Sequence, residues 1–317
     1  MQTLNELVMC PNCASIKINW TAIKVSCIEC LSEFRRDEEF VDFVEDSTLY
    51  ELEAKTLEVW GNDLHKTALS VQPHFIQMQQ LFPEIWKRSL SGNVLEIGCG
   101  SGTDTFNMSK LNESISLIAF DLGSNVARLS KLFRNQKNIH IFRANALSIP
   151  LRNDSINMVY SFGVFHHTNN PAKCFEEAYR VMNKKGTLFF YVYSSHEDNI
   201  FKYSGIWLEK ILMKTFKSIP NSLHTKLLFF LSMPCLLLFS WPSHLLKILG
   251  LTGIAKRFPM HWGTTPASII PDLKDRLLAP VNHRFRYQDL KNLAELSSFR
   301  DIHIEKTSSG LFGYCIK

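Results

Sequence analysis

The first residues of the chain lack a long apolar run, and they include the acidic Glu6. A secretory signal needs such a run, so we expect a cytoplasmic location. A large excess of one charge is also missing, because 35 Lys and Arg stand against 30 Asp and Glu, for a net charge of +5. That balance permits weak attraction to nucleic acid or to an anionic membrane but requires neither. With 45% hydrophobic residues, the composition is ordinary for a folded protein.

The stretch from Leu227 to Leu246 lacks Lys, Arg, Asp and Glu altogether. A charge-free stretch of about 20 residues is long enough to span a bilayer. Pro234, Pro242 and several serines interrupt it, however, and strand-like sequence follows downstream. We therefore expect a helical cap, with a peripheral membrane contact as the sharper alternative.

Cysteine is present in a pattern that is typical of a metal site. Four of the eight cysteines form two Cys-x-x-Cys pairs separated by thirteen residues, Cys10 with Cys13 and Cys27 with Cys30. Two such pairs can converge on one tetrahedral zinc ion. Disulfides are the alternative, and the missing secretory signal weighs against them. The remaining cysteines stand in apolar surroundings, where we expect small core residues.

The segment around these pairs resembles the zinc ribbon of small activator subunits of RNA and protein methyltransferases. The resemblance covers about Met9 to Val44, where short strand-like stretches surround the second pair. It implies a folding and docking module whose zinc is structural. Such a short segment cannot build an adequate core without its metal.

The most informative stretch is Val94-Leu95-Glu96-Ile97-Gly98-Cys99-Gly100-Ser101-Gly102. Its apolar start predicts the end of a buried parallel strand. The glycines permit a sharp turn and let a ligand lie against bare backbone. A second strand, 116–120, ends in Asp121, where a carboxylate is placed to accept both ribose hydroxyls of an adenosine.

These two motifs resemble those of class I S-adenosylmethionine-dependent methyltransferases. The glycine spacing differs from the dinucleotide fingerprint, and Glu96 would repel a phosphate. The resemblance covers about 93–194, with the motifs in the family's order. It implies cofactor contacts by Glu96, Gly98, Cys99, Gly100, Gly102, Asp121, Leu122, Asn145, Ala146, Ser161 and Phe162. Asn145 stands where the family commonly has Asp, and it keeps a carbonyl acceptor for the adenine amino group.

Two adjacent histidines follow the predicted fourth strand. The stretch from Phe162 to Thr168 resembles one that methyltransferases of small molecules and lipids often carry, and it contains His166 and His167. Ligands bind at the C-terminal ends of strands in open α/β sheets. A hydroxyl acceptor is helped by a base with a pKa near neutrality, so these histidines are the catalytic candidates. Packing and capping of the next helix are their alternative roles.

We therefore expect an α/β protein with a Rossmann-like seven-stranded methyltransferase sheet, a helical cap insertion and a small N-terminal zinc ribbon. The expected parts are a zinc ribbon at 1–45, a helical linker at 46–92, the cofactor-binding core at 93–195, the cap at 196–285, and a final helix with a β-hairpin at 286–317. In the linker, Trp60, His65 and His74 are candidates for a roof over the cofactor. His283 and Arg284 stand at the return of the cap, where they point into the cleft or lie in an exposed loop.

The expected function is methyl transfer from S-adenosylmethionine to a small-molecule, lipid-like or glycan-like acceptor, by O- or N-methylation. Two alternatives stay open. One is a zinc-ribbon RNA methyltransferase of the ribosomal guanine type, although those commonly have His where Cys30 stands here. The other is a non-catalytic scaffold that keeps the cofactor fold. The partners expected are the acceptor and, through 227–246, a membrane surface.

Overall fold

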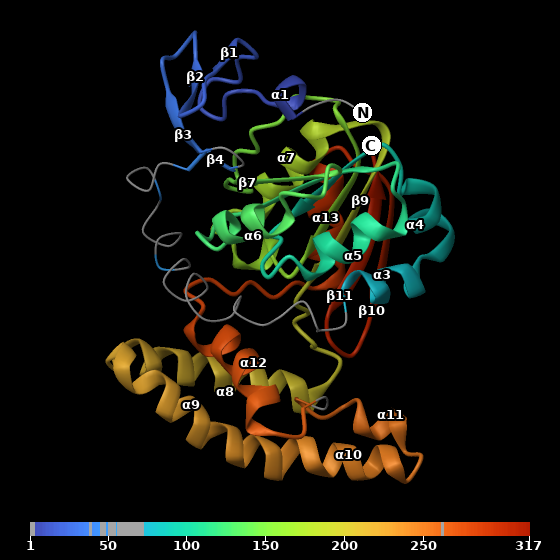
Figure 1. Cartoon of the computed structure of the whole chain (residues 1–317). Helices are drawn as coiled ribbons and strands as arrows, with labels where there is room; N and C mark the ends of the chain where they lie inside the picture. Colours follow the sequence, from blue (N-terminus) through green and yellow to red (C-terminus); the bar gives the residue numbers. More distant parts are fainter. Residues whose placement is uncertain (1–3, 38–39, 45–48, 50–54, 56–72, 261–262) are drawn as a thin grey trace.

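A computed structural model describes residues 4–37, 40–44, 49, 55, 73–260 and 263–317. It consists of one mixed sheet flanked by helices, with a separate layer of helices below it (Figure 1). The expected linker at 46–92 is described only in its last part, which forms α3 (Phe75–Leu81) and α4 (Pro83–Ser89). Trp60 and His65 lie outside the described residues.

The sheet has eleven strands in the order β1-β2-β3-β4-β7-β6-β5-β8-β9-β11-β10, so the expected count of seven is wrong. Seven consecutive strands, from β7 to β10, do carry the core expected from the sequence. They are β5 (Asn93–Ile97), β6 (Ser116–Asp121), β7 (Ile139–Arg143), β8 (Ile156–Phe162), β9 (Met182–Val192), β10 (Arg300–Lys306) and β11 (Leu311–Ile316). The strands β5 to β9 are parallel to one another, whereas β11 is antiparallel to its neighbours β9 and β10.

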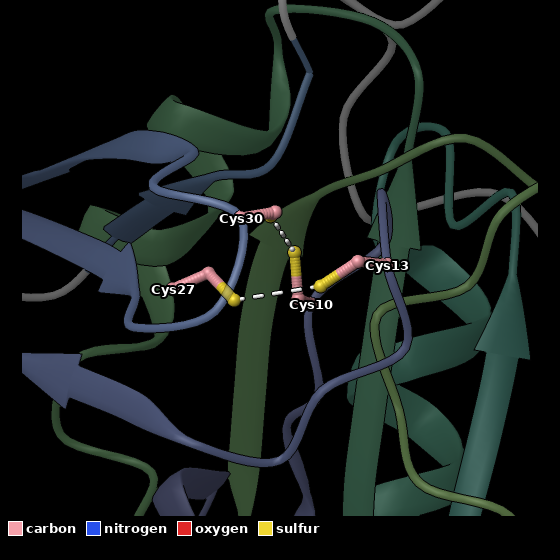
Figure 2. Close-up of side chains that lie close together, drawn as sticks. All are labelled: Cys10, Cys13, Cys27 and Cys30. Atoms are coloured by element: carbon pink, nitrogen blue, oxygen red, sulfur yellow. Dashed lines mark hydrogen bonds between the residues drawn. The ribbon is translucent and has the colours of Figure 1, made fainter.

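The extra four strands come from the N-terminal segment. After the short helix α1 (Leu4–Leu7), they are β1 (Ile18–Trp20), β2 (Lys24–Cys27), β3 (Glu33–Asp37) and β4 (Phe40–Asp42). β4 pairs parallel with β7, where Asp42 lies opposite Arg143. The guanidinium of Arg143 also pairs with the Asp42 carboxylate, at 3.2 Å between Nη1 and Oδ2. The two Cys-x-x-Cys loops of this segment converge so that their four sulfurs face one another (Figure 2).

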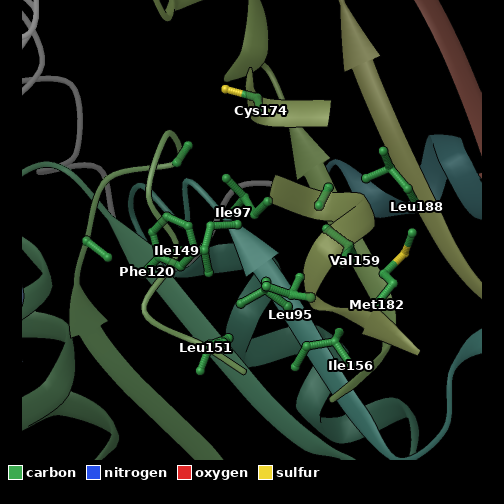
Figure 3. Packing of buried hydrophobic residues seen from close by; sticks show 14 of the residues in the cluster. Leu95, Ile97, Phe120, Ile149, Leu151, Ile156, Val159, Cys174, Met182 and Leu188 are labelled. Atoms are coloured by element: carbon green, nitrogen blue, oxygen red, sulfur yellow. The ribbon is translucent and has the colours of Figure 1, made fainter. Parts of the chain in front are cut away.

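The alternation of side chains along β5 divides the core between two faces of the sheet. Leu95 and Ile97 point toward one face, where they share a buried cluster with α7 (Pro171–Val181) and α13 (Tyr287–Leu296) (Figure 3). Val94 points to the opposite face, which is covered by α3, α4 and α5 (Thr103–Leu111). α6 (Val126–Phe133) packs against β7 and covers the neighbouring part of the sheet. As expected, Cys99, Cys174, Cys235 and Cys315 are all buried.

The insertion between β9 and α13 is helical. It contains α8 (Ile200–Lys217), α9 (Asn221–Cys235), the π-helical turn η4 (Leu236–Ser240), α10 (Trp241–Ile248), α11 (Thr252–Ala255) and α12 (Pro266–Leu278). Among the described residues, one continuous helix at Ser222–Ile248 is long and apolar enough to cross a membrane by length and composition. α9 and α10 lie at the bottom of the molecule, with α8 and α12 nearer to the sheet (Figure 1).

Candidate active site and metal centre

The glycine-rich loop connects β5 to α5 at the C-terminal end of the sheet. Gly98, Gly100 and Gly102 all have positive φ, at 78°, 50° and 78°. A Cβ on Gly98 would come within 2.2 Å of Val164 Cγ2, so no other residue fits there without a local shift. The loop therefore keeps bare backbone beside the segment that follows β8, which is the arrangement that a closely bound ligand requires.

Asp121 ties this loop to the end of β6. Its Oδ2 accepts a hydrogen bond from the Gly100 N–H at 3.0 Å, and its Oδ1 accepts one from the Gly123 N–H at 2.8 Å. β5 and β6 are paired in parallel, with Ile97 opposite Phe120, so the loop and the carboxylate meet at one sheet edge. The carboxylate remains half-buried and keeps lone pairs for a ribose hydroxyl, since each oxygen accepts more than one hydrogen bond.

Below the loop lies a pair of buried carboxyl groups, of which the sequence analysis singled out one. Glu96 is buried and accepts a hydrogen bond from the Thr105 hydroxyl at 2.6 Å. Burial raises the pKa of Glu96 well above its usual value, and the charge of nearby Asp104 raises it further. Asp104 accepts hydrogen bonds from the His74 N–H and the Tyr160 hydroxyl, both at 2.7 Å. A cationic ligand group here would offset the cost of burying two carboxyl groups.

The expected roof residue His74 does lie at this crevice. Its ring stacks on Phe162 at the end of β8, with 4.5 Å between the ring centroids. Phe162 in turn stacks on Tyr191 of β9, at 4.4 Å. A row of stacked aromatic rings therefore runs from His74, directly before α3, across the ends of β8 and β9.

The other expected cofactor residues occupy the same edge of the sheet. Ser161 is buried, and its hydroxyl has no hydrogen-bond partner among the described atoms. Asn145 uses its side-chain oxygen to accept the Leu147 N–H at 2.9 Å, which orients the amide at the end of β7. Cys99 and Ala146 are buried, and Leu122 is half-buried. The unpartnered hydroxyl, the bare glycine backbone and the paired carboxyl groups fit a ligand that combines a cation with an adenosine.

The two candidate histidines differ in what surrounds their rings. His167 has partners on both sides, because its Nδ1 donates to the Val281 carbonyl at 2.9 Å and its Nε2 lies 3.0 Å from Asp275 Oδ1. Burial alone would lower the pKa of His167, but the charge of Asp275 raises it above the usual value. His167 is therefore held as a structural cation and has no free nitrogen for a base.

His166 has the opposite character. It is fully buried, and neither ring nitrogen has a hydrogen-bond partner among the described atoms. Its ring stacks on Tyr193 with 4.0 Å between centroids. Burial lowers the pKa of His166 well below its usual value, and the charges of His167 and Arg284 lower it further. Its imidazole is thus neutral near pH 7 and keeps a nitrogen lone pair, although the lowered pKa makes it a weaker base than the near-neutral one expected from the sequence.

This difference predicts a pH-dependent stability. The unfolded chain protonates His166 below about pH 6.5, whereas the folded chain keeps it neutral, so the free energy of unfolding should fall as the pH falls. His167 acts in the opposite direction, because its raised pKa gives a contribution that is full below the pKa of the unfolded chain and is lost as the pH rises through the folded pKa. In urea unfolding between about pH 6.5 and 5, His166→Phe should reduce the slope by about 1.4 kcal/mol per pH unit. Equal slopes for the two proteins would contradict the assignment.

A buried ionic network joins the insertion to the histidines. Asp275 of α12 accepts a hydrogen bond from the Tyr193 hydroxyl and pairs with His167. Glu209 of α8 pairs with Arg284 and, at 3.4 Å, with Arg276. Arg284 is thus buried in the network, whereas His283 is exposed and its Nε2 donates to the Thr168 carbonyl at 3.1 Å. Asp275, Arg276 and Glu209 were missed in the sequence, where each stands beside other charged residues and nothing local shows that they meet the histidines.

The four N-terminal cysteines form the candidate metal centre. Their sulfur atoms all lie within 4.8 Å of one another, and the Cys10–Cys30 and Cys13–Cys27 sulfur pairs are 3.5 Å apart (Figure 2). Tetrahedral zinc with bonds of about 2.3 Å separates its sulfurs by about 3.8 Å. A hydrogen bond with the Ser32 hydroxyl lowers the pKa of Cys30 to about 6, which favours the thiolate. The donor set therefore fits one zinc ion.

Comparison with known proteins concerns mainly the sheet. Residues 95–190 match the family model of a methyltransferase domain. An uncharacterized protein of Methanocaldococcus jannaschii is 30% identical over 131 residues, which are 41% of this chain and 46% of that protein. An uncharacterized chloroplastic methyltransferase of Arabidopsis thaliana is 26% identical over 110 residues, covering 32% and 31% of the two chains. The chain thus spans less than half the length of these curated relatives.

Among the solved structures to which the chain is similar is an S-adenosylmethionine (SAM)-dependent methyltransferase from Aquifex aeolicus. It has 15% sequence identity and a TM-score of 0.42, and the alignment covers 78% of this chain and 99% of that one. The family model begins at Leu95 of the glycine motif and ends at Phe190 of β9. It therefore includes the glycine loop, Asp121 and both histidines. The match indicates a methyltransferase domain in residues 95–190.

Proposed function

We propose that the chain transfers a methyl group from S-adenosylmethionine to an oxygen or nitrogen atom of a small-molecule or lipid-like acceptor. The observation that carries the proposal is the place of the buried His166 imidazole just after β8, with both ring nitrogens without a hydrogen-bond partner in the described part of the chain. Glu96 and Asp104 suit the cationic methionine end, and Asp121 suits the ribose. The zinc of the cysteine cluster has a structural role only.

The residues of this chain would act mainly by positioning. The bound cofactor supplies an electrophilic methyl group, whose bond to sulfur breaks as the bond to the acceptor forms. The acceptor loses one proton, and we assign its removal to His166, since His167 has no free nitrogen. Arg284 and Arg276 keep the neighbourhood positive, which favours the neutral form of His166. Because the His166 ring is fully buried, the acceptor reaches it only when the insertion shifts.

His166→Gln should slow methyl transfer about 10²- to 10⁴-fold, which is the usual contribution of a general base. Its affinity for S-adenosylmethionine should stay within about twofold, because His166 makes no contact with the glycine loop or Asp121. The measurement pairs calorimetric titration with transfer of a labelled methyl group into cell-extract fractions. Glu176→Gln, an exposed change on α7, is the matched control and should leave both quantities unchanged. Equal transfer by His166→Gln and wild type would remove His166 from the mechanism.

A further inference from the structure

One face of the insertion is both apolar and exposed. The helix Ser222–Ile248 has 27 residues, and its most apolar window has a mean hydropathy of 1.6, yet only 17% of that window is buried. Buried positions recur every three or four residues on the side that packs against α11 and α12, namely Leu228, Ser232, Leu236, Ser240 and Ser243. The exposed positions follow the same spacing on the opposite side, at Phe230, Met233, Leu237, Trp241, Leu245 and Ile248. We call this second row, together with the neighbouring exposed Leu238, the apolar stripe.

The apolar stripe is too large for an ordinary water-facing surface. Phe230, Leu238 and Ile248 are 69%, 63% and 70% exposed. At about 1.5 Å per residue the stripe from Phe230 to Ile248 is about 27 Å long. Contiguous exposed apolar surface of this extent marks an interaction site. The stripe lies opposite the side of the helix that packs against α11 and α12. α9 and α10 themselves lie beyond α8 and α12 from the sheet (Figure 1), so the stripe belongs to the outer part of the insertion.

The charge around the stripe identifies its occupant. Residues 200–257 contain eight Lys and Arg but a single acidic residue, Glu209. This segment therefore carries a net charge of +7, whereas the rest of the chain carries −2. Glu209 is buried and paired with two arginines, and Lys202 is buried as well, so neither contributes to the surface charge, which stays strongly positive. Lys226 borders the charge-free part of the helix at one end, and Lys247, Lys256 and Arg257 follow at the other.

We propose that the helix Ser222–Ile248 lies in the surface plane of an anionic lipid bilayer. The apolar stripe enters the boundary between headgroups and acyl chains, while the flanking Lys and Arg contact the acidic headgroups. Trp241 is exposed on the stripe, and tryptophan is enriched at this depth of a membrane. The proposal concerns a surface outside the crevice, so it does not depend on the proposed methyl transfer.

The packing of the helix favours this in-plane position over a membrane span. The Ser240 hydroxyl donates to the Met260 carbonyl at 2.6 Å, and the Ser243 hydroxyl donates to the Ala255 carbonyl at 3.0 Å. If the helix crossed the membrane, it would carry the segment around Ala255 and Met260, with the charged Lys256 and Arg257, into the hydrocarbon. A helix in the surface plane keeps these neighbours out of the hydrocarbon and leaves Lys256 and Arg257 at the level of the headgroups.

Co-sedimentation of the full chain with lipid vesicles tests the proposal. The chain should bind vesicles of phosphatidylcholine with phosphatidylglycerol much more strongly than vesicles of phosphatidylcholine alone, and high salt should weaken the difference. Phe230→Glu with Leu238→Glu should reduce binding at least about tenfold, since both side chains lose apolar burial. Lys226→Gln with Lys256→Gln should reduce binding to the anionic vesicles about 30-fold, or about fivefold per cation. Leu296→Glu, at an 87% exposed leucine of α13, is the matched control and should bind normally.

Several outcomes would overturn the proposal. One is a wild-type chain that sediments with neither kind of vesicle, and another is equal binding by the stripe variant and wild type. Failure of alkaline carbonate to release the chain from vesicles would replace the in-plane helix with a span. A dimer in solution that Phe230→Glu with Leu238→Glu converts to a monomer, without vesicle binding by either protein, would make a second copy of the chain the occupant. Unchanged far-ultraviolet circular dichroism confirms that each variant is folded.

Discussion

Asp121→Ala is expected to weaken binding of S-adenosylmethionine about 10- to 150-fold, or about 1.5–3 kcal/mol, which is the scale of hydrogen bonds to a charged group. The structure adds a second reason for the loss. The same carboxylate accepts the N–H groups of Gly100 and Gly123, so its removal also frees the glycine loop. Calorimetric titration of the full chain with S-adenosylmethionine measures the change.

Two further variants separate the ligand contact from the loop contact. Asp121→Asn keeps one acceptor oxygen without the charge, so its affinity should fall between those of wild type and Asp121→Ala. Asp289→Ala, at an exposed aspartate in the first turn of α13, should bind as wild type does. If Asp121→Ala kept the affinity of wild type, the crevice assigned here would not be the cofactor site.

Cys27→Ser is expected to abolish binding of one zinc ion and to unfold the N-terminal segment first. The free energy of zinc binding in such small modules is about 10–16 kcal/mol and appears as folding free energy. The loss should spread to the sheet, because Val8, Phe34 and Phe43 share the core cluster with Phe142 and Ile149. Metal analysis and urea unfolding together report both effects.

Cys174→Ser is the matched control for this experiment. It also replaces a buried cysteine, but one that lies in α7 and outside the sulfur cluster. This variant should retain about one zinc per chain. A metal-free wild-type protein that is reduced, folded and as stable as the metal-loaded protein would refute a structural zinc.

The sequence predicted the local elements of the core because each has a short-range signal. Glycine spacing marked the turn after β5, and apolar runs marked the parallel strands, which are buried on both faces. These signals depend only on neighbours in the chain, so no tertiary contact was needed to interpret them.

The wrong strand count arose because pairing between distant segments leaves no local signal. Nothing in Phe40-Val41-Asp42 specifies that β4 continues the sheet beside β7. Asp42 of β4 pairs with Arg143 of β7, which is about one hundred residues away in the sequence. The two residues meet only in the folded chain, so neither segment alone predicts the contact. A module that was expected to stand apart therefore became the edge of the main sheet.

The histidines and the apolar segment show a second limit of sequence reasoning. His166 and His167 are adjacent and chemically identical, and only their folded surroundings distinguish them. Asp275 and Val281 saturate His167, whereas His166 faces Tyr193. Similarly, composition revealed that 227–246 is apolar but not which way its side chains point. Because many of these side chains are exposed, we now assign the apolar contact to an outer surface instead of a substrate pocket.

Methyl transfer itself tests the central proposal most directly. Purified full-length chain is incubated with methyl-labelled S-adenosylmethionine and a cell extract separated into lipid, small-molecule, RNA and protein fractions. Gly100→Val is the control, because a branched side chain at a φ of 50° both strains the loop and fills the space of the cofactor. We predict label in the lipid or small-molecule fraction with wild type and none with Gly100→Val. Label in RNA alone would contradict the proposed acceptor, and no label in any fraction despite calorimetric binding of the cofactor would contradict the proposed catalysis.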